Sequence, residues 1–310
     1  MNCSIIIRAY NEEKHIGRLL EGIRHQTVSD VETILVDSGS TDSTVEIAES
    51  HGARAVRIPA EEFTFGRSLN YGIREASCEY LVIASAHVYP VYPDWLAALL
   101  HPLLDGQVAL SYGKQRAPLS ANFSEKQIYH QWYPEVGKQH QETAFCNNAN
   151  AAIRRSIWAK KAYDETLTGL EDLAWAKWVQ EQGYEISYVA EAEIIHIHEE
   201  TPRGVFNRYR REAMAYRRIF PESHFSIYDF VRLTCANIGS DIWHASQEKA
   251  LWKNLVSILW FRLMQFHGTR VGHRASSQIT PQLRETFYYA RGRKSRGETR
   301  REVEPIQYHK

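Results

Sequence analysis

Tyr80-Leu-Val-Ile-Ala-Ser-Ala-His-Val-Tyr-Pro90 is the stretch that decides the fold. Residues 80–84 form a continuous apolar run of strand length, which is typical of a strand buried on both faces of a parallel sheet. The run stops at Ser85 and His87, and Pro90 closes it. In open α/β sheets, ligands bind beyond the carboxyl ends of the strands. His87 is therefore expected at a ligand-binding edge.

Strand and helix patterns alternate on both sides of this run. Short β-branched or apolar runs predict strands at residues 4–7, 33–36, 53–58 and 108–112, with helical spacing of apolar residues between them. The alternation predicts an α/β fold with a mostly parallel, Rossmann-like sheet flanked by helices. Residues 113–145 lose the pattern and suggest a long functional loop. Extended character returns at 145–153, 185–189 and 193–198.

Composition excludes several classes of protein. The 310 residues are 44% hydrophobic, enough for a full core, and 37 basic residues balance 37 acidic ones, so no nucleic-acid partner is expected. No apolar run is long enough to span a membrane, and no secretory signal is expected. The four cysteines are far apart and form no metal or disulfide spacing, which fits a reducing compartment. A cytoplasmic location is predicted, with the inner face of the membrane as an option.

From residue 205 onward the chain is predicted to be helical, in segments near 205–219, 226–245 and 248–267. We place a domain boundary near residue 203, between an α/β domain (1–203) and a helical extension (204–310) with a loose, charged tail from Arg291. The last helices carry aromatic residues among basic ones. Core packing, a homodimer interface and peripheral contact with a membrane surface all remain open for these aromatic residues.

Several motifs recur along the chain in one order. They are Arg8-Ala-Tyr-Asn-Glu-Glu13, Val36-Asp-Ser-Gly-Ser-Thr-Asp42, Phe65–Gly72, the strand that ends at His87, Phe145–Asn150, Glu171–Trp175 and Ile195–His198. Each motif alone is weak, but the ordered set is specific. It resembles the family-2 glycosyltransferases of the GT-A fold, and within them the rhamnosyltransferase-like group. The resemblance covers roughly residues 3–220.

This resemblance implies the inverting transfer of a sugar from a nucleotide diphosphate sugar, of the UDP or dTDP type, to an acceptor hydroxyl. The acceptor would be a glycan or a lipid-linked precursor in polysaccharide synthesis. The resemblance also implies that Asp37 lines the nucleoside pocket, where a carboxylate can accept from a pyrimidine N–H or a ribose hydroxyl. The alternative for the Asp37 motif is an ordinary turn before a helix. The other residues implied in the nucleoside pocket are Ala9, Tyr10, Asn11, Glu12 and Gly39.

The sequence departs from the family at the metal site. Where the family has Asp-x-Asp, this chain has Ser85-Ala86-His87. The resemblance implies a divalent metal, Mn²⁺ or Mg²⁺, and imidazole suits transition ions better than Mg²⁺. His87 is predicted as a metal ligand, and contact with the donor phosphates or simple packing are its alternatives. His196 and His198 lie on one face of a strand by their spacing, and we favour His198 as the second ligand.

Glu171 and Asp172 match the acidic pair of the family at the start of a helix. Inversion by direct displacement needs a base that takes the acceptor's proton, and the resemblance implies that Asp172 is this base. Glu171 is the second candidate and is expected to contact the acceptor. The alternative is helix capping, because acidic residues favour the first turn.

Further donor contacts are predicted for Arg67, Asn70 and Asn148, together with Ser85 and Ala86. Asn147 and Asn150 are expected beside Asn148 in the cleft, although bracing of loops would also explain them. Arginines at 203, 208, 210 and 211 suit a diphosphate or a solvated helix face. Two rival functions stay open. A nucleotidyltransferase would need a Gly-rich phosphate loop that residues 8–15 lack, and a catalytically impaired sugar-nucleotide-binding protein has no need of Glu171 and Asp172.

Overall fold

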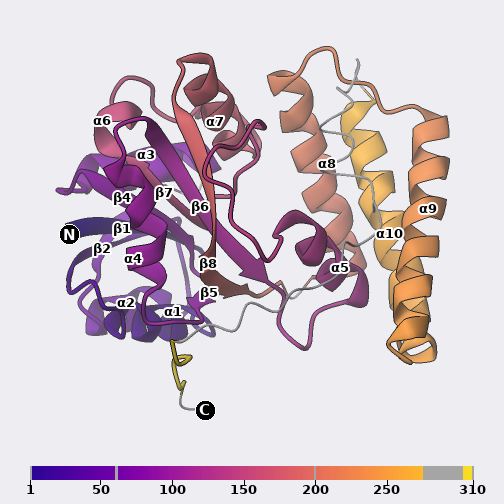
Figure 1. The fold of residues 1–310 in the computed structure, drawn as a ribbon, viewed down its shortest axis with the longest axis horizontal. Coiled ribbons are helices and arrows are strands. Elements are labelled where there is room, and N and C mark those ends of the chain that lie inside the picture. Colours follow the sequence, from indigo (N-terminus) through magenta and orange to yellow (C-terminus); the bar gives the residue numbers. More distant parts are fainter. Residues whose placement is uncertain (1, 60–61, 199, 275–302, 309–310) are drawn as a thin grey trace.

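A computed structural model describes the chain except for residues 1, 60–61, 199, 275–302 and 309–310. Its elements follow one another as a string of short strands and helices that ends in three long helices (Figure 1). In chain order they are β1 (Asn2–Ala9), α1 (Ile16–Arg24), β2 (Asp30–Asp37), α2 (Thr44–Ser50), β3 (Arg54–Arg57), α3 (Phe65–Glu75), β4 (Tyr80–Ser85), β5 (Val88–Pro90), α4 (Trp95–Leu100), the 3-10 helix η2 (His101–Leu104), β6 (Val108–Arg116), α5 (Phe123–Trp132), β7 (Asn150–Arg154), α6 (Arg155–Trp158), α7 (Glu171–Glu181), β8 (Glu185–His196), α8 (Pro202–Ile219), α9 (Ile227–Gln247) and α10 (Leu251–His273).

The strands form one sheet in the order β3-β2-β1-β4-β7-β6-β8-β5. Strand β4, the apolar run that decides the fold, lies in its interior. Strands β1, β2, β3 and β4 run parallel to one another, and β6 runs parallel to β8. Strand β7 is antiparallel to both of its neighbours, and β5 is antiparallel to β8. The predicted α/β fold with a mostly parallel sheet is therefore confirmed.

Helices cover both faces of the sheet, because successive side chains of a buried strand point to opposite sides. Ile5 and Ile7 of β1 pack with α1, α2 and α4 on one face, whereas Ile6 packs with α3, α6 and α7 on the other. Both clusters consist of buried side chains, mainly aliphatic on the first face and with many aromatic residues on the second. This three-layer arrangement leaves the carboxyl ends of β1, β2 and β4 at one edge, where a ligand site is expected.

Three local predictions were wrong. The residues read as two strands at 185–189 and 193–198 form the single strand β8, which keeps its pairing with β6 through an irregularity between Gly113 and Gln115. The supposed loop 113–145 contains helix α5, whose buried face includes the polar Ser124 and Glu125. Because polar residues occupy part of the buried face, the sequence of α5 lacks the regular spacing of apolar residues that predicts a helix. The short strand β5 after His87 was not predicted.

The C-terminal helices pack on one another and on α5. Helix α10 lies close to α8 because Gly268 and Gly272 have no side chain, and a Cβ at Gly268 would come within 2.3 Å of the Phe206 carbonyl oxygen. An ion pair then joins the helices to the α/β part. The Arg262 guanidinium on α10 donates from Nε to Asp241 on α9 at 2.7 Å, and Asp241 also accepts from Ser124 on α5 at 2.6 Å.

The aromatic residues of these helices divide between core and surface. Phe261 and Phe266 are buried, which confirms core packing for them, whereas Trp243 and Trp252 are exposed. The homodimer and membrane-surface alternatives for the exposed residues stay predictions, as does the domain boundary near residue 203, which falls in the first turn of α8. In the part of the chain that the structure describes, no helix is both long and apolar enough to cross a membrane.

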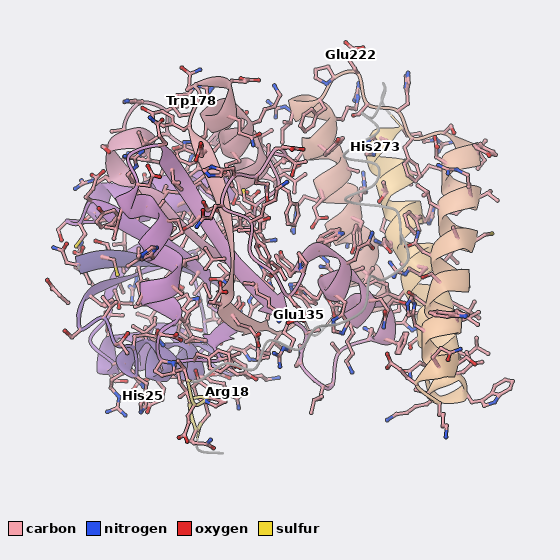
Figure 2. All side chains as sticks on the ribbon, viewed as in Figure 1. Arg18, His25, Glu135, Trp178, Glu222 and His273 are labelled. Carbon is pink, nitrogen blue, oxygen red and sulfur yellow. The ribbon has the colours of Figure 1, made fainter. Side chains whose placement is uncertain are left out.

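The predicted loose tail lies partly outside the described residues, but residues 303–308 are packed. The Ile306 amide donates to the carbonyl of Val91 at 3.0 Å, and the Tyr308 ring lies 5.2 Å from that of Tyr89, edge to face. The Arg18 guanidinium lies 4.9 Å from the centre of the Tyr89 ring, at the margin where Figure 2 shows this segment in yellow. Ile306 and Tyr308 therefore lie against the segment around β5.

Candidate active site

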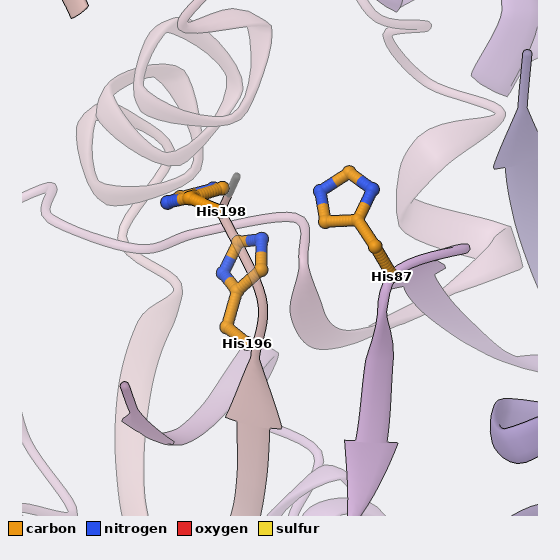
Figure 3. A group of neighbouring side chains, drawn as sticks. All are labelled: His87, His196 and His198. Carbon is orange, nitrogen blue, oxygen red and sulfur yellow. The ribbon is translucent and has the colours of Figure 1, made fainter. Parts of the chain in front are cut away.

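Three histidines meet at the edge of the sheet. His87 follows β4, and Val88 pairs with His196 at the end of β8, so the turn between β4 and β5 brings His87 to the other two. The rings of His87 and His196 are stacked at 5.1 Å, and those of His196 and His198 are 4.1 Å apart. One nitrogen from each of the three lies within 4.8 Å of the others. Figure 3 shows the three rings gathered around one space.

Each of these imidazoles is held at Nδ1 by a side-chain oxygen. The anchors come from three different elements of the chain, namely the segment after β1, strand β6 and helix α5. Their distances are 2.7 Å from His87 Nδ1 to Glu12 Oε1, 2.7 Å from His196 Nδ1 to Gln115 Oε1, and 2.8 Å from His198 Nδ1 to Glu125 Oε1. An oxygen acceptor at Nδ1 favours the proton at that nitrogen and leaves the lone pair on Nε2. Nδ1 of His198 has two further neighbours, the Tyr129 hydroxyl at 3.3 Å and the Arg208 guanidinium at 3.5 Å.

Burial determines the charge of this cluster. Desolvation, followed by the charge of His198, lowers the pKa of His196 well below its usual value. Desolvation and the Arg208 guanidinium do the same to the pKa of His198. Both rings are therefore neutral at pH 7. The Nε2 atom of His196 is buried and has no hydrogen-bond partner among the described residues.

Two carboxylates lie at the first turn of α7. Leu170, with a φ of 56°, turns the chain into the helix, and the backbone N–H of Asn148 donates to Asp172 Oδ2 at 2.9 Å. The other oxygen of Asp172 accepts from the N–H of Leu173 at 2.8 Å. Glu171 Oε1 accepts from the Arg8 guanidinium at 3.2 Å and from the side-chain amide of Asn148 at 3.3 Å.

The environment of Asp172 shifts its proton affinity into the neutral range. Burial, with a second contribution from the charge of Glu171, raises the pKa of Asp172 to about 7, while the two backbone N–H groups and Arg8 act in the opposite direction. A carboxylate with a pKa near the working pH combines a useful ionised fraction with good basicity. Asp172 is thus suited to general-base catalysis, whereas Glu171 is held by a cation.

One cavity of about 330 Å³ contains both groups. The three histidines line one part of it and Glu171 and Asp172 another, with Ser85, Asn147 and Asn148 also on its wall. Phe65 lies between two guanidinium groups, since those of Arg8 and Arg211 each lie 4.7 Å from the centre of its ring. Helices α5 and α8 and the residues next to them supply much of the remaining wall, both aromatic and charged. The aromatic residues are Tyr129, Trp132, Tyr133 and Tyr209, and the charged ones are Glu125, Glu200, Arg208 and Glu212.

The residues predicted for the nucleoside pocket lie together beside this cavity. Ala9 pairs with Asp37 across the ends of β1 and β2. Asp37 is buried, and its two oxygens accept from the N–H groups of Gly39 and Ser40, each at 3.1 Å. These bonds brace the turn that Gly39 forms at a φ of 97°. Asn11 accepts from Thr41 at 2.8 Å, Tyr10 is exposed, and Glu12 connects the turn to His87.

Other predicted residues do not reach the cavity. Arg67 donates to Glu165 at 2.9 Å, and the Asn70 side chain binds Glu165 and the backbone of Tyr163. Asn150 is buried and braces strands by donating to the carbonyl of Ala192 at 2.8 Å. Ala86 is fully buried behind the edge. These side chains have structural partners, so their predicted donor contacts find no support in the geometry.

Sequence reasoning missed four residues of the site. Arg8, Gln115, Glu125 and Tyr129 line the cavity, but none belongs to a motif with a chemical signature of its own. Gln115 and His196 are 81 residues apart, and Arg8 and Glu171 are 163 apart. Only the position of Arg8 inside the first motif could have singled it out.

Comparison with known proteins gives concordant results. Residues 4–161 match the family described as "Glycosyl transferase family 2". The chain is 28% identical over 222 residues to "O-antigen chain rhamnosyltransferase RfbN" of Salmonella typhimurium, which covers 67% of this chain and 70% of that protein. It is 27% identical over 218 residues to "O-antigen chain rhamnosyltransferase WbaN" of Salmonella anatum, over 66% and 69% of the two chains.

Solved structures share the fold. A "Mannosyltransferase PcManGT from Pyrobaculum calidifontis in complex with GDP-Man and Mn2+" superposes with a TM-score of 0.60 at 17% identity, over 87% of this chain and 86% of that one. The S. aureus TarS fragment 1–349 in complex with UDP-GlcNAc gives a TM-score of 0.55 at 14% identity, over 88% and 91% of the two chains. The GT-A architecture expected from the sequence is thereby confirmed.

Proposed function

The chain belongs to glycosyl transferase family 2, a family of glycosyltransferase enzymes, and from this premise we propose that it transfers a sugar with inversion from a nucleoside diphosphate sugar to a hydroxyl group. Its O-antigen rhamnosyltransferase relatives support a glycan or lipid-linked acceptor in polysaccharide synthesis, and a donor of the dTDP or UDP type. The nucleotide sugars held by the solved neighbours support the donor class. A cytoplasmic location at the inner face of the membrane is part of this proposal.

The observation that carries the proposal is Asp172. Its carboxyl group is 8% exposed, has a pKa raised to about 7, and shares a cavity with the histidines at the ligand-binding edge of the sheet. A buried carboxylate without a bound cation of its own is expensive to maintain, and such groups cluster at catalytic sites. A catalytically impaired binding protein has no use for it.

The proposed chemistry is a single displacement. Asp172 takes the proton of the acceptor hydroxyl as that oxygen attacks the anomeric carbon of the donor. The bond from the anomeric carbon to the diphosphate oxygen breaks at the same time, and the diphosphate leaves with the electron pair from the opposite side. The sugar is therefore delivered with inverted configuration. The carboxylate of Glu171 forms an ion pair with the Arg8 guanidinium and so keeps this positive charge near Asp172.

The donor is proposed to lie across the carboxyl edge of the sheet. The nucleoside would rest against residues 9–12 and 37–39. Glu12 belongs to this region and also contacts His87, so the diphosphate attached to the nucleoside would reach the histidine cluster. The three imidazoles and the unpartnered Nε2 of His196 fit a divalent cation held by nitrogen ligands. Such an ion would supply neutralisation of the diphosphate charge. The arginine pair around Phe65 offers a second positive region on the cavity wall.

A thermal-shift screen of nucleotide sugars tests the proposal. The true donor binds the folded state alone, so it should raise the melting temperature, and by RT ln(1 + [L]/Kd) a hundredfold excess over Kd contributes about 2.7 kcal/mol. UDP-, dTDP- and GDP-sugars are compared with the matching nucleoside monophosphates as controls. A donor that shifts the melting temperature should also be consumed slowly with water as acceptor. If no nucleotide sugar is bound and none is consumed, the proposal is wrong.

A further inference from the structure

We infer that the imidazoles of His87, His196 and His198 form an all-nitrogen site for one divalent transition-metal ion, and that Glu12, Gln115 and Glu125 position these ligands. The inference deepens the proposed function, on which the role of the metal at the donor diphosphate rests. It extends the expectation that His87 and His198 bind Mn²⁺ or Mg²⁺, because it adds His196 as a third ligand. The expected order of affinity is Zn²⁺ and Co²⁺ above Mn²⁺, and Mn²⁺ above Mg²⁺.

The first argument is the pattern of anchors. All three rings are bound at Nδ1 by a side-chain oxygen, at 2.7, 2.7 and 2.8 Å. Histidines that bind metal through Nε2 nearly always donate their other N–H to a carboxylate, carbonyl or water. The three pairs come from separate elements, and one nitrogen of each ring lies within 4.8 Å of the nitrogens of the other two.

The second argument is the bare nitrogen of His196. Its side chain is 6% exposed, and its Nε2 has no hydrogen-bond partner among the described residues. A buried polar atom without a partner is costly, so it needs an explanation such as an ion. His196 is flanked by His87 and His198, whose nitrogens lie within 4.8 Å. A metal ion among the three would satisfy this atom.

The ligand set decides which ion fits. One carboxylate oxygen of Glu12 and one of Glu125 is bound to an imidazole, and Ser85 and His87 stand where the family has the two carboxylates of Asp-x-Asp. Mg²⁺ demands oxygen ligands, whereas neutral imidazole suits Zn²⁺, Co²⁺ and their neighbours. Direct contact with phosphate is disfavoured by the same tautomers, since a ring whose N–H is already donated can offer phosphate oxygens only a lone pair.

A neighbouring cluster is less suited to a cation. Glu125, His198 and Glu200 also lie within reach of one another. However, the Arg208 guanidinium lies 2.7 Å from Glu200 and 3.4 Å from Glu125. This cation already neutralises both carboxylates and would repel a metal ion between them. Arg208 also approaches the three-imidazole site, but only at His198 Nδ1, at 3.5 Å, whereas His87 and His196 have Glu12 and Gln115 as their hydrogen-bond partners.

Metal titration of the full chain, after removal of adventitious ions with chelator, tests the inference. Calorimetry should give one Zn²⁺ or Co²⁺ per chain, and bound Co²⁺ should show the visible absorption of a nitrogen-rich, low-coordinate site. A large excess of Mg²⁺ should not displace it. No stoichiometric binding, or displacement of Co²⁺ by equimolar Mg²⁺, would overturn the inference. These measurements on the wild-type protein need no variant to fold.

Variants then assign the ligands and their anchors. His196→Ala should abolish stoichiometric binding, and Gln115→Ala should weaken Co²⁺ affinity by roughly 10–100-fold, the usual effect of losing an outer-shell partner. His140→Ala is the matched control, because His140 is paired with Glu185 at 2.6 Å in the same way but is exposed and alone. Glu200→Gln should also leave affinity unchanged. Unaltered binding in folded His196→Ala contradicts the assignment.

The outcomes separate this inference from the proposed function. If the protein transfers sugar in chelator and binds no metal, the metal site is refuted while the glycosyltransferase proposal stands. If one metal ion binds with the expected selectivity but no nucleotide sugar is consumed, the site stands and the proposed reaction is wrong.

Discussion

Replacing Asp172 by Asn removes the proposed base with little change of shape. The rate of transfer should fall by roughly 10²–10⁴-fold, the usual worth of general-base catalysis. Donor affinity should stay within about twofold, because the base serves the acceptor. Folding should survive, although the Asn side chain has one acceptor oxygen and its NH₂ cannot accept, so one of the Asn148 and Leu173 N–H groups that now bind the carboxylate loses its partner. That loss costs about 1–3 kcal/mol, and it is offset in part by removal of the repulsion with Glu171.

The pH dependence follows from the raised pKa. With a pKa of about 7, Asp172 is ionised in roughly a tenth of molecules at pH 6 and in roughly nine tenths at pH 8. The wild-type rate should therefore rise about tenfold between these values, and the residual rate of the Asn variant should not. Glu171→Gln provides a matched control. The charge of Glu171 helps to raise the pKa of Asp172, so its removal should shift the midpoint to lower pH.

The same group should affect stability in the opposite direction. Its pKa is 3.8 as a free group and about 7 in the folded chain, so the folded state binds more protons between these values. Stability from this group is therefore lost as the pH rises from about 4 to about 7. The assay is initial-rate kinetics across pH with melting curves in parallel. A folded Asn variant that transfers sugar at near the wild-type rate, or a wild-type rate flat from pH 6 to 8, would refute the assignment.

Three further predictions address the nucleotide, the helical extension and the chain end. Asp37→Ala should weaken binding of a nucleoside diphosphate by about 1–3 kcal/mol in calorimetry. Asp42→Ala, which removes the hydrogen bonds from Thr44 and from the Glu13 backbone N–H, should weaken it less, and equal affinities of Asp37→Ala and the wild type would remove Asp37 from the pocket. Arg262→Met alone should lower the free energy of unfolding in urea by about 3–5 kcal/mol, because it leaves the buried carboxylate of Asp241 without its cation. The double variant with Asp241→Leu should recover most of this loss. A single variant with unchanged stability would show that the pair does not hold the helices. Tyr308→Ala should lower the melting temperature, since the ring packs on Tyr89 of β5, and an unchanged melting curve would show that this contact carries no stability.

The sequence predicted those strands and helices whose own pattern of apolar residues determines their structure. The apolar run of β4 and the alternation around it predicted the sheet, and the order of motifs predicted the family. Helix α5 could not be seen, because Ser124 and Glu125 face inward to meet Asp241 and His198, and polar residues at buried positions erase the apolar stripe. The short exposed interruption at Glu191 made β8 look like two strands, although β6 carries the pairing across it.

Only part of the candidate site could be predicted from the sequence, because several of its residues act through partners far away in the chain. His87, His198, Glu171 and Asp172 stand in motifs, and the structure brings all four to one cavity. Gln115, Glu125 and Arg8 gain their roles from partners 81, 73 and 163 residues away, and such contacts depend on the complete fold. Conversely, Asn70 and Arg67 looked suited to a ligand but bind Glu165, which follows them by about 100 residues in the chain.

The central claim is that one displacement assisted by Asp172 inverts the sugar, and the stereochemistry of donor hydrolysis tests it most directly. Water replaces the unknown acceptor, so the measurement needs only the donor found in the thermal-shift screen. Proton NMR in the first minutes, before the free sugar mutarotates, identifies the anomer that is formed first. The account predicts the anomer opposite to that of the donor, formed at a rate that the Asp172→Asn variant lowers. Release of the same anomer as the donor's would contradict a single displacement.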